Sequence, residues 1–279
     1  MWRETAYAKI NLALHVRARR ADGYHDIETL FAFVDAGDAL TAVEADQDSL
    51  TITGEFAAGL SAGPDNLVLR ALASMRNMAG GESIPPVAIS LEKNLPVAAG
   101  LGGGSADAAA VIRMLDREFH ICGDGKELVI ANSHLGADVG ACIVSETRRG
   151  TGTGWELAEV DDSDVKGLAL LLINPYESMA TGPVFAGWDG QDRGALREGT
   201  ALAAARAGRN DLEPPAIALC EEIDEVLAVL RAQLPVLARM SGSGASCFAL
   251  FRDAVQRDAA AKRIARDHPE WWQMAGALR

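Results

Sequence analysis

The chain has 279 residues, a formal net charge of −13 at pH 7 and a hydrophobic content of 49%. This length fits one large or two modest domains, and the composition excludes a disordered chain, a collagen-like repeat and a coiled coil. An acidic surface repels nucleic acid and anionic membranes, so neither is expected as a partner.

Alternating apolar residues in the first part of the chain predict strands rather than helices. The predicted strands cover residues 6–18, 27–34, 39–43, 50–52 and 87–91. Asp22-Gly23 predicts a turn after the first strand. A helix is predicted over 66–78, because the segment is rich in Leu, Ala, Met and Arg and ends before Gly80-Gly81.

The rest of the chain mixes helices and strands. Helices are predicted from near Ser105 through Leu115, and over 126–134, 200–207, 216–233 and 254–266, and strands over 168–173, 236–240 and 247–251. There is no regular alternation of strand and helix, so the predicted fold class is α+β rather than a doubly wound sheet. A change of composition near residue 150 predicts two domains, 1–150 and 151–279.

The cysteines argue against metal and disulfide frameworks. No CxxC pair occurs and no cysteine has a histidine at ligand spacing, so four small buried side chains in a reducing compartment are expected. These are Cys122, Cys142, Cys220 and Cys247. The N-terminal residues lack the apolar region of a signal peptide, and the longest strongly apolar run, 168–173, cannot span a bilayer. A cytoplasmic protein is expected.

A glycine-rich segment, Gly100-Leu-Gly-Gly-Gly-Ser105, lies between a predicted strand and an alanine-rich helix. Glycines let the backbone approach a ligand closely, and a helix beginning there directs its N–H groups and positive end at the loop. The pattern therefore predicts a polyphosphate site, with an ordinary flexible turn as the alternative. It is neither a Walker A loop nor a Rossmann fingerprint, since both spacings fail.

Lys9 stands in an apolar strand pattern, on the same strand face as Asn11. An inward-facing lysine is costly unless it is paired. A lysine on an edge strand that faces water is the usual case, and a catalytic lysine is the alternative.

Asp138 lies between small residues in Gly136-Ala-Asp-Val-Gly140. It can cap a short helical turn, or it can serve as a base in a tight backbone environment. Sequence spacing does not decide between the two, and it does not show a contact with Lys9.

A third glycine cluster, Ser241-Gly-Ser-Gly244, separates two predicted strands. It predicts either a simple hairpin turn or a second loop that faces phosphate or substrate.

The three clusters, in this order, resemble the GHMP small-molecule kinases. Ala8-Lys-Ile-Asn-Leu12 matches their first motif, Pro96 to Ser105 their glycine-rich loop, and Met240 to Phe251 their glycine-rich hairpin. Arg20-Ala-Asp-Gly-Tyr-His25 and Asn210-Asp-Leu-Glu213 are similar to one branch, which phosphorylates the 2-hydroxyl of a cytidine-diphosphate-linked methylerythritol in the non-mevalonate isoprenoid pathway. The DGYH segment discriminates best among branches, and the resemblance covers residues 6–251.

The resemblance implies a fold and roles for individual residues. It implies a ribosomal S5 domain 2-like N-terminal domain, a ferredoxin-like C-terminal domain, a site between them, and direct transfer from ATP with Mg²⁺ but no protein metal-ligand set. The implied catalytic residues are Asp138 as general base and Lys9 as the cation beside it. The implied ATP-binding residues are Asn66, Lys93, Leu95, Pro96, Gly100, Leu101, Gly102, Gly103, Gly104 and Ser105. The implied residues for the cytidine-diphosphate-linked polyol are Asn11, Tyr24, His25 and Phe185. A monomer or homodimer is expected.

Two segments depart from the pattern of this branch. Gly140 stands where proline is usual, and residues 145–155 lack the cleaner RGxGE pattern. Three alternatives to this branch exist. Another GHMP kinase, of the homoserine or mevalonate type, and a nucleotide-binding protein without activity remain open, whereas an RNA-binding protein conflicts with the acidic balance.

Overall fold

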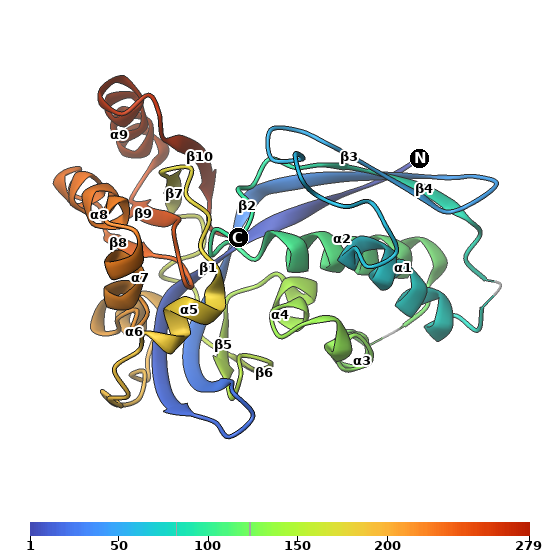
Figure 1. Ribbon diagram of the computed structural model, residues 1–279, viewed down its shortest axis with the longest axis horizontal. Coiled ribbons are helices and arrows are strands. Elements are labelled where there is room, and N and C mark those ends of the chain that lie inside the picture. Colours follow the sequence, from blue (N-terminus) through green and yellow to red (C-terminus); the bar gives the residue numbers. More distant parts are fainter. Residues whose placement is uncertain (82, 123) are drawn as a thin grey trace. The chain divides into compact units, whose positions relative to one another are not determined.

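The computed structural model describes residues 1–81, 83–122 and 124–279 (Figure 1). These residues cluster into two compact units, each made of three chain segments. Unit 1 contains Met1–Ala8, Gly37–Val97 and Gly102–Ser145, and unit 2 contains Lys9–Ala36, Ala98–Leu101 and Glu146–Arg279. The segments alternate because two long strands, β1 (Trp2–Arg19) and β2 (His25–Glu44), each contribute to both units.

Unit 1 combines the start of β1, up to Ala8, and the end of β2, from Gly37, with further strands and helices. The further elements are β3 (Ser49–Thr53), α1 (Leu67–Met78), β4 (Val87–Glu92), α2 (Gly103–Phe119), α3 (Gly125–Ala131), the 3-10 turn η1 (Ser133–Leu135) and α4 (Val139–Val144). The end of β2 pairs antiparallel with β4, and β4 pairs parallel with β3. Helices α1 and α2 pack against each other along one face of these strands (Figure 1).

Local sequence explains the two main helices of unit 1. The Asn66 side chain caps α1 by accepting from Val68 N at 2.9 Å, and the buried residues of α1 recur at helical spacing. In α2 the residues from Ala106 to Leu115 are buried except Arg113, and four of them are alanine, whose small side chains let the helix lie close to its neighbours. A close approach also occurs at Gly140 in α4, where a Cβ atom would lie 3.0 Å from Val129 Cγ1 of α3.

Unit 2 contains β1 from Lys9 onward, β2 up to Ala36 and the second half of the chain. Its further elements are β5 (Arg148–Thr151), β6 (Glu156–Glu159), β7 (Ala169–Asn174), α5 (Thr181–Ala186), α6 (Ala201–Ala207), α7 (Glu213–Leu219), α8 (Glu222–Ala232), β8 (Leu237–Met240), β9 (Cys247–Phe251), α9 (Ala254–Asp267) and β10 (Trp272–Ala277). The start of β2 pairs with β5, and β5 pairs with β6.

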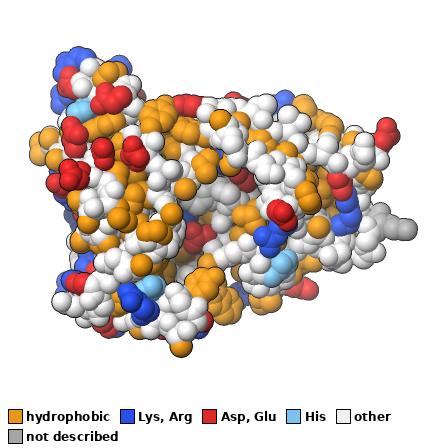
Figure 2. All heavy atoms as spheres, in the orientation of Figure 1, with side chains coloured by type: hydrophobic (Ala, Val, Ile, Leu, Met, Phe, Trp, Pro, Cys, Tyr) orange, Lys and Arg blue, Asp and Glu red, His pale blue; other side chains and the backbone are white. Residues whose placement is uncertain are grey.

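An antiparallel sheet in the order β10-β7-β9-β8 forms the centre of unit 2. All residues of β7 and β9 are buried, and α8 and α9 pack on the sheet. The first turn of α8 carries Glu222, Asp224 and Glu225, where negative charge suits the helix dipole. Figure 2 shows acidic side chains gathered over this part of the surface.

Most predicted elements are confirmed, although their ends shift. The strands predicted at 27–34 and 39–43 are one continuous strand, β2, and α2 begins at Gly103, two residues before the expected start. The single helix predicted over 216–233 is wrong. The chain forms α7 and α8 there, because Cys220 is extended, with φ −149° and ψ 97°, and ends α7. Helices α4 and α5 and strands β5, β6 and β10 were not predicted.

The α+β class is confirmed by these two groups of strands with helices beside them. The passage from unit 1 to unit 2 at Ser145–Glu146 lies near the expected boundary at residue 150, whereas residues 9–36 and 98–101 cluster with the later part of the chain. Three cysteines are buried free thiols as expected, but Cys122 is only half-buried. Within the described ranges, no helix is both long and apolar enough to cross a membrane.

Candidate active site

The second half of the glycine-rich segment, residues 102–105, forms the start of α2 in unit 1. Gly102 caps the helix with φ +65°, a left-handed conformation that favours glycine. Its carbonyl accepts from Ala106 N at 2.8 Å, so the helix is regular from its first turn. The N–H groups of that turn have no intrahelical acceptor and point out of the helix end. Together with the helix dipole they form a set of oriented donors suited to phosphate oxygens.

A buried charge cluster, made of Lys93, Asp38 and Asp107, lies directly beside this helix start. Lys93 Nζ donates to Asp107 Oδ2 at 2.7 Å and also to Asp38 Oδ2, and none of the three residues is more than 4% exposed. A Cβ atom on Gly103 would lie 3.3 Å from Lys93 Nζ. The lysine predicted to bind ATP is therefore packed under the loop, with its ammonium held by two carboxylates.

The cluster holds one positive and two carboxyl groups away from water. The pKa of Asp107 is raised to about 7 as a net result: burial is the largest cause and raises it, the charge of Lys93 lowers it, and the neighbouring Asp38 carboxylate raises it. Burial lowers the pKa of Lys93, but the carboxylates of Asp107 and Asp38 outweigh it, so the net shift is upward. Asp107 Oδ1 is buried without a hydrogen-bond partner. A proton on Asp107 would relieve the excess negative charge of the cluster.

Asp38 also fixes the chain that leads toward the glycine-rich segment. Its Oδ1 accepts from Asn94 N at 2.6 Å and from Leu95 N at 2.8 Å. Leu95, predicted to bind ATP, is thereby placed by a residue that sequence reasoning did not single out. An aspartate in an otherwise apolar strand, just after Gly37, was the available signal. The other predicted ATP residue of this region, Asn66, uses its side chain to cap α1 and to donate to Ser61 O.

Asp138 occupies the N-cap position of α4 in unit 1, but its side chain makes no capping hydrogen bond. Its backbone carbonyl accepts from Cys142 N at 3.0 Å, and the residue is half-buried. The far end of α4 is fixed by Arg113, which donates to Cys142 O and, at 2.9 Å, to Ser145 Oγ. The carboxylate does not cap α4, and its role as a base stays a prediction.

Lys9 and Asn11 lie together in unit 2, on β1. Lys9 Nζ donates to Asn11 Oδ1 at 2.9 Å and lies 5.5 Å from the ring centre of Phe31. Asn11 Nδ2 donates to Thr29 Oγ1 at 2.7 Å, which fixes the amide so that its oxygen faces the ammonium. The expectation of a lysine facing water is wrong, since Lys9 is 4% exposed. All residues of β1 from Ala8 to Val16 are buried, so both faces of the strand are covered here.

The first part of the glycine-rich segment and the two residues before it, together residues 98–101, are held within unit 2 by the hairpin turn of residues 241–246. Ser241 Oγ donates to Gly100 O at 2.8 Å, and Ser246 N donates to Ala99 O at 3.1 Å. A Cβ atom on Gly100, whose φ is +77°, would lie 2.1 Å from Ser241 O. The structure thus brings the glycine-rich segment and the 241–244 glycine cluster together, and the loop between β8 and β9 is a hairpin turn, while a role of this loop toward phosphate or substrate stays a prediction.

The second motif of the branch, Asn210-Asp-Leu-Glu213, connects that hairpin to β1. Asn210 Nδ2 donates to Met240 O at 2.9 Å and to Gly242 O at 2.8 Å. Asp211 N donates to Leu14 O at 2.8 Å, so this segment lies alongside β1. Sequence reasoning used the motif only for its resemblance and did not foresee this supporting role.

An aromatic group surrounds His25 at the start of β2, in unit 2. The rings of His25 and Phe185 lie with centres 5.0 Å apart, and Trp188 meets His25 edge-on at 5.8 Å. Burial and then the charge of Arg19 lower the pKa of His25. Tyr24 is 64% exposed, an unusual position for an aromatic ring. Of the four residues predicted to bind substrate, His25 and Phe185 are therefore in contact, while Asn11 lies in the Lys9 group.

Comparison with known proteins finds two parts of one family pattern, in order along the chain. The description "GHMP kinases N terminal domain" matches residues 66–146, and "GHMP kinases C terminal" matches residues 192–272. The chain is 57% identical to a 4-diphosphocytidyl-2-C-methyl-D-erythritol kinase of Sphingopyxis alaskensis, over 99% of this chain and 98% of that protein. Identity to the enzyme of the same name from Erythrobacter litoralis is 52%, over 99% and 98%.

A solved structure supports the assignment at the level of the fold. The crystal structure of a 4-(cytidine 5'-diphospho)-2C-methyl-D-erythritol kinase superposes with a TM-score of 0.80 and 30% identity, covering 99% of this chain and 98% of that one. Both halves of the family pattern are present in order, and relatives match over nearly their whole length. The chain is therefore a kinase that belongs to the GHMP kinase family.

Proposed function

We propose that this chain transfers the γ-phosphoryl group of ATP to the 2-hydroxyl of 4-diphosphocytidyl-2-C-methyl-D-erythritol, in the non-mevalonate route to isoprenoid precursors. The observation that carries the proposal is full-length identity of 52–57% with kinases named for this substrate. The DGYH segment and the contact between His25 and Phe185 support the cytidine part of it. The enzyme would act in the cytoplasm, as a monomer or homodimer.

The proposed ATP site uses the backbone more than side chains. Residues 102–105 supply N–H donors for phosphate oxygens, and Leu95 and Pro96 would lie at the adenosine. These groups suit a polyphosphate that binds together with a metal cation. Mg²⁺ keeps several waters and often binds through substrate phosphates, so the ion would accompany ATP with few protein ligands. Its chemistry there is neutralisation of the charge on the transferred group.

Asp138 is the proposed general base. The substrate oxygen would form a bond to the γ-phosphorus while the bond to the bridging β,γ-oxygen breaks, and the hydroxyl proton would pass to Asp138 as ADP leaves. The position of Asp138 supports this role, because the residue is half-buried at the start of α4, in the same unit as residues 102–105. Lys9, oriented by Asn11 Oδ1, would stabilise the developing alkoxide.

The test is a phosphorylation assay with ATP, Mg²⁺ and the cytidylyl polyol, followed by ³¹P NMR of the product. Asp138→Asn is expected to lower kcat by about 10²- to 10⁴-fold while ATP binding persists, because the base is lost and the volume is kept. Asp46→Asn, an exposed aspartate in the turn before β3, is the matched control. Near-normal turnover by Asp138→Asn would remove the base assignment.

A thermal-shift titration separates this function from that of other GHMP kinases. Cytidine diphosphate is expected to stabilise the protein, because a ligand that binds only the folded state raises the unfolding temperature. Homoserine and mevalonate are expected to have no effect. Stabilisation by either of these, with no response to cytidine diphosphate, would favour a different substrate.

A further inference from the structure

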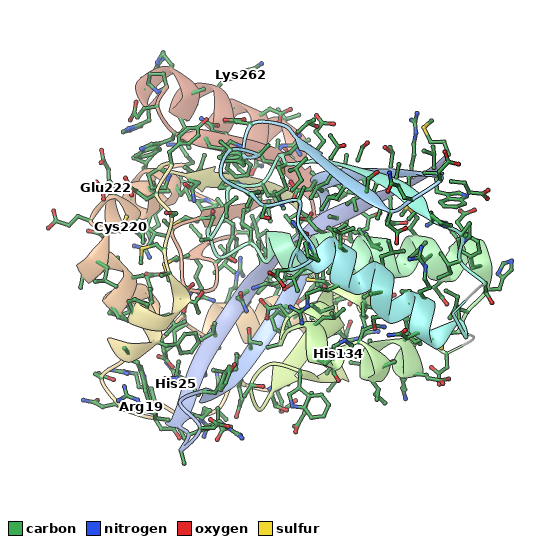
Figure 3. All side chains as sticks on the ribbon, turned by 45° about the vertical axis from the view of Figure 1, so that its right-hand side comes forward. Arg19, His25, His134, Cys220, Glu222 and Lys262 are labelled. Carbon is green, nitrogen blue, oxygen red and sulfur yellow. The ribbon has the colours of Figure 1, made fainter. Side chains whose placement is uncertain are left out.

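Arg19, the last residue of β1, lies beside His25 at the start of β2, as Figure 3 shows. Arg19 Nε donates to His25 Nε2 at 3.3 Å, and Arg19 Nη2 donates to Ala186 O at 3.4 Å. The guanidinium therefore connects the histidine with the end of α5, the helix that carries Phe185.

This contact determines which ring nitrogen of His25 carries the proton. A guanidinium stays protonated in proteins and offers only donors, so the nitrogen facing it must be an acceptor. A neutral imidazole has one donor and one acceptor, which places the proton of His25 on Nδ1. Burial and the charge of Arg19 both lower the pKa of His25, and both therefore favour this neutral form.

The surroundings of His25 leave Nδ1 for a ligand. Within the described ranges, no hydrogen bond involves Nδ1, and the neighbouring rings of Phe185 and Trp188 are uncharged. Among the described residues, the charge that acts on His25 is that of Arg19; Asp26, the next residue along the chain, pairs instead with Arg20. A flat base that stacks in this aromatic group would meet a donor at the edge of the histidine.

We propose that Arg19 is a positioning residue for base specificity: it holds His25 in the Nδ1–H form, which suits the acceptor edge of cytosine. The ring nitrogen N3 of cytosine is an acceptor, whereas that of uracil carries a proton and is a donor. A fixed N–H on His25 therefore complements cytosine and opposes uracil, and rejection by unpaired or opposed polar groups is an effective form of discrimination. This inference rests on the proposed cytidylyl substrate.

The first experiment needs no substrate. In ¹⁵N NMR of the whole protein, with His25 assigned by comparison with His25→Gln, the wild type is expected to show Nδ1–H and a pKa below the ordinary value. Arg19→Gln is expected to shift His25 toward a mixture of tautomers and to raise its pKa. Arg19→Lys, which restores a cation and a donor, is expected to recover part of the wild-type signature. An Nε2–H signature in the wild type would overturn the proposal.

The second experiment compares cytidine- and uridine-diphosphate-linked substrates. Arg19→Gln is expected to reduce the ratio of their kcat/KM values by about five- to tenfold, through KM rather than kcat, the value of one hydrogen bond. Arg266→Gln, an exposed arginine of α9 paired with Asp267, is the control. An unchanged ratio in Arg19→Gln would overturn the specificity role.

The two experiments separate the inference from the proposed function. A wild type that does not phosphorylate the cytidylyl polyol overturns the proposed function and, with it, the cytosine role, whatever tautomer NMR finds. A wild type that is active and carries Nε2–H overturns only the role of Arg19. An active wild type with Nδ1–H and a reduced ratio in Arg19→Gln supports both.

Discussion

The two halves of the glycine-rich segment are supported in different ways. Residues 102–105 stand beside the buried charge cluster of unit 1, where a lysine is shared by two carboxyl groups. Residues 98–101 are held in unit 2 by neutral hydrogen bonds to a hairpin, at a distance that admits no side chain on Gly100. The first support depends on charge and therefore on pH. The second depends on space, so different substitutions should disturb each half.

The largest effect is expected from Lys93→Met, which leaves two carboxyl groups buried without their cation. Removing one partner of a buried ion pair typically costs about 3–5 kcal/mol in the free energy of unfolding. Urea denaturation at pH 7 measures it, and Lys262→Met, an exposed lysine of α9, is the control. A loss under about 1 kcal/mol would mean that the carboxyl groups are not held by Lys93.

Gly100→Ala tests the steric support. A Cβ atom there meets Ser241 O at 2.1 Å, and φ is +77°, so a loss of about 2–4 kcal/mol in unfolding free energy is expected. Gly190→Ala is a matched control, because its φ is +80° and nothing lies within 4 Å of the added atom. The difference between the variants isolates the close approach. Equal losses would show that backbone conformation alone requires glycine.

Asp107→Asn tests whether the buried charge cluster makes the stability of unit 1 depend on pH. The folded-state pKa of Asp107 is raised from its ordinary 3.8 to about 7, with burial as the largest cause, so the folded protein binds a proton that the unfolded chain has released. Its contribution to stability is present below pH 4 and is lost as the pH rises through 7, with a slope of at most about 1.4 kcal/mol per pH unit. The variant is expected to lack this slope between pH 4 and 7. Identical pH profiles of unfolding free energy would contradict the assignment.

Ser241→Ala should have the smallest effect. It removes the hydroxyl that donates to Gly100 O and accepts from Asn11 N, and a loss of about 1 kcal/mol is expected, independent of pH. Ser163→Ala, whose hydroxyl bonds only the nearby Asp161 on the surface, serves as the comparison and is expected to be nearly neutral. A pH-dependent loss in Ser241→Ala would show that the hairpin support is not purely neutral.

Elements with strong local signals were predictable from the sequence. Helix α1 has a capping Asn66 and buried residues at helical spacing, and β7 is a continuous apolar run. The short β5 and β6 were missed because they are partly exposed and lack an apolar pattern. The break between α7 and α8 was missed because the apolar periodicity continues across it. Pro214 and Pro215 mark only the start of α7 and give no signal for its end.

The site was predictable as a set of residue types but not as a set of contacts. The glycine segment and Lys9 stand out in the sequence, whereas the partners of Lys93 come from positions 55 and 14 residues away. Lys93 was predicted to bind ATP, and the two carboxylates that already bind its ammonium were not foreseen. Arg19 and His25 are six residues apart, yet only the turn between β1 and β2 makes their side chains meet.

The order of the central sheet of unit 2 bears on how the protein is made. Strand β7, whose six residues are all buried, pairs on one side with β9 and on the other with β10. Both partners are synthesised after it, so a nascent chain carries an apolar strand with two unpaired edges until residues 247–251 have been added, and with one unpaired edge until residues 272–277 follow. Such a strand invites intermolecular pairing. Dependence on chaperones during synthesis, and aggregation of a variant lacking residues 272–279, follow from this placement of β7.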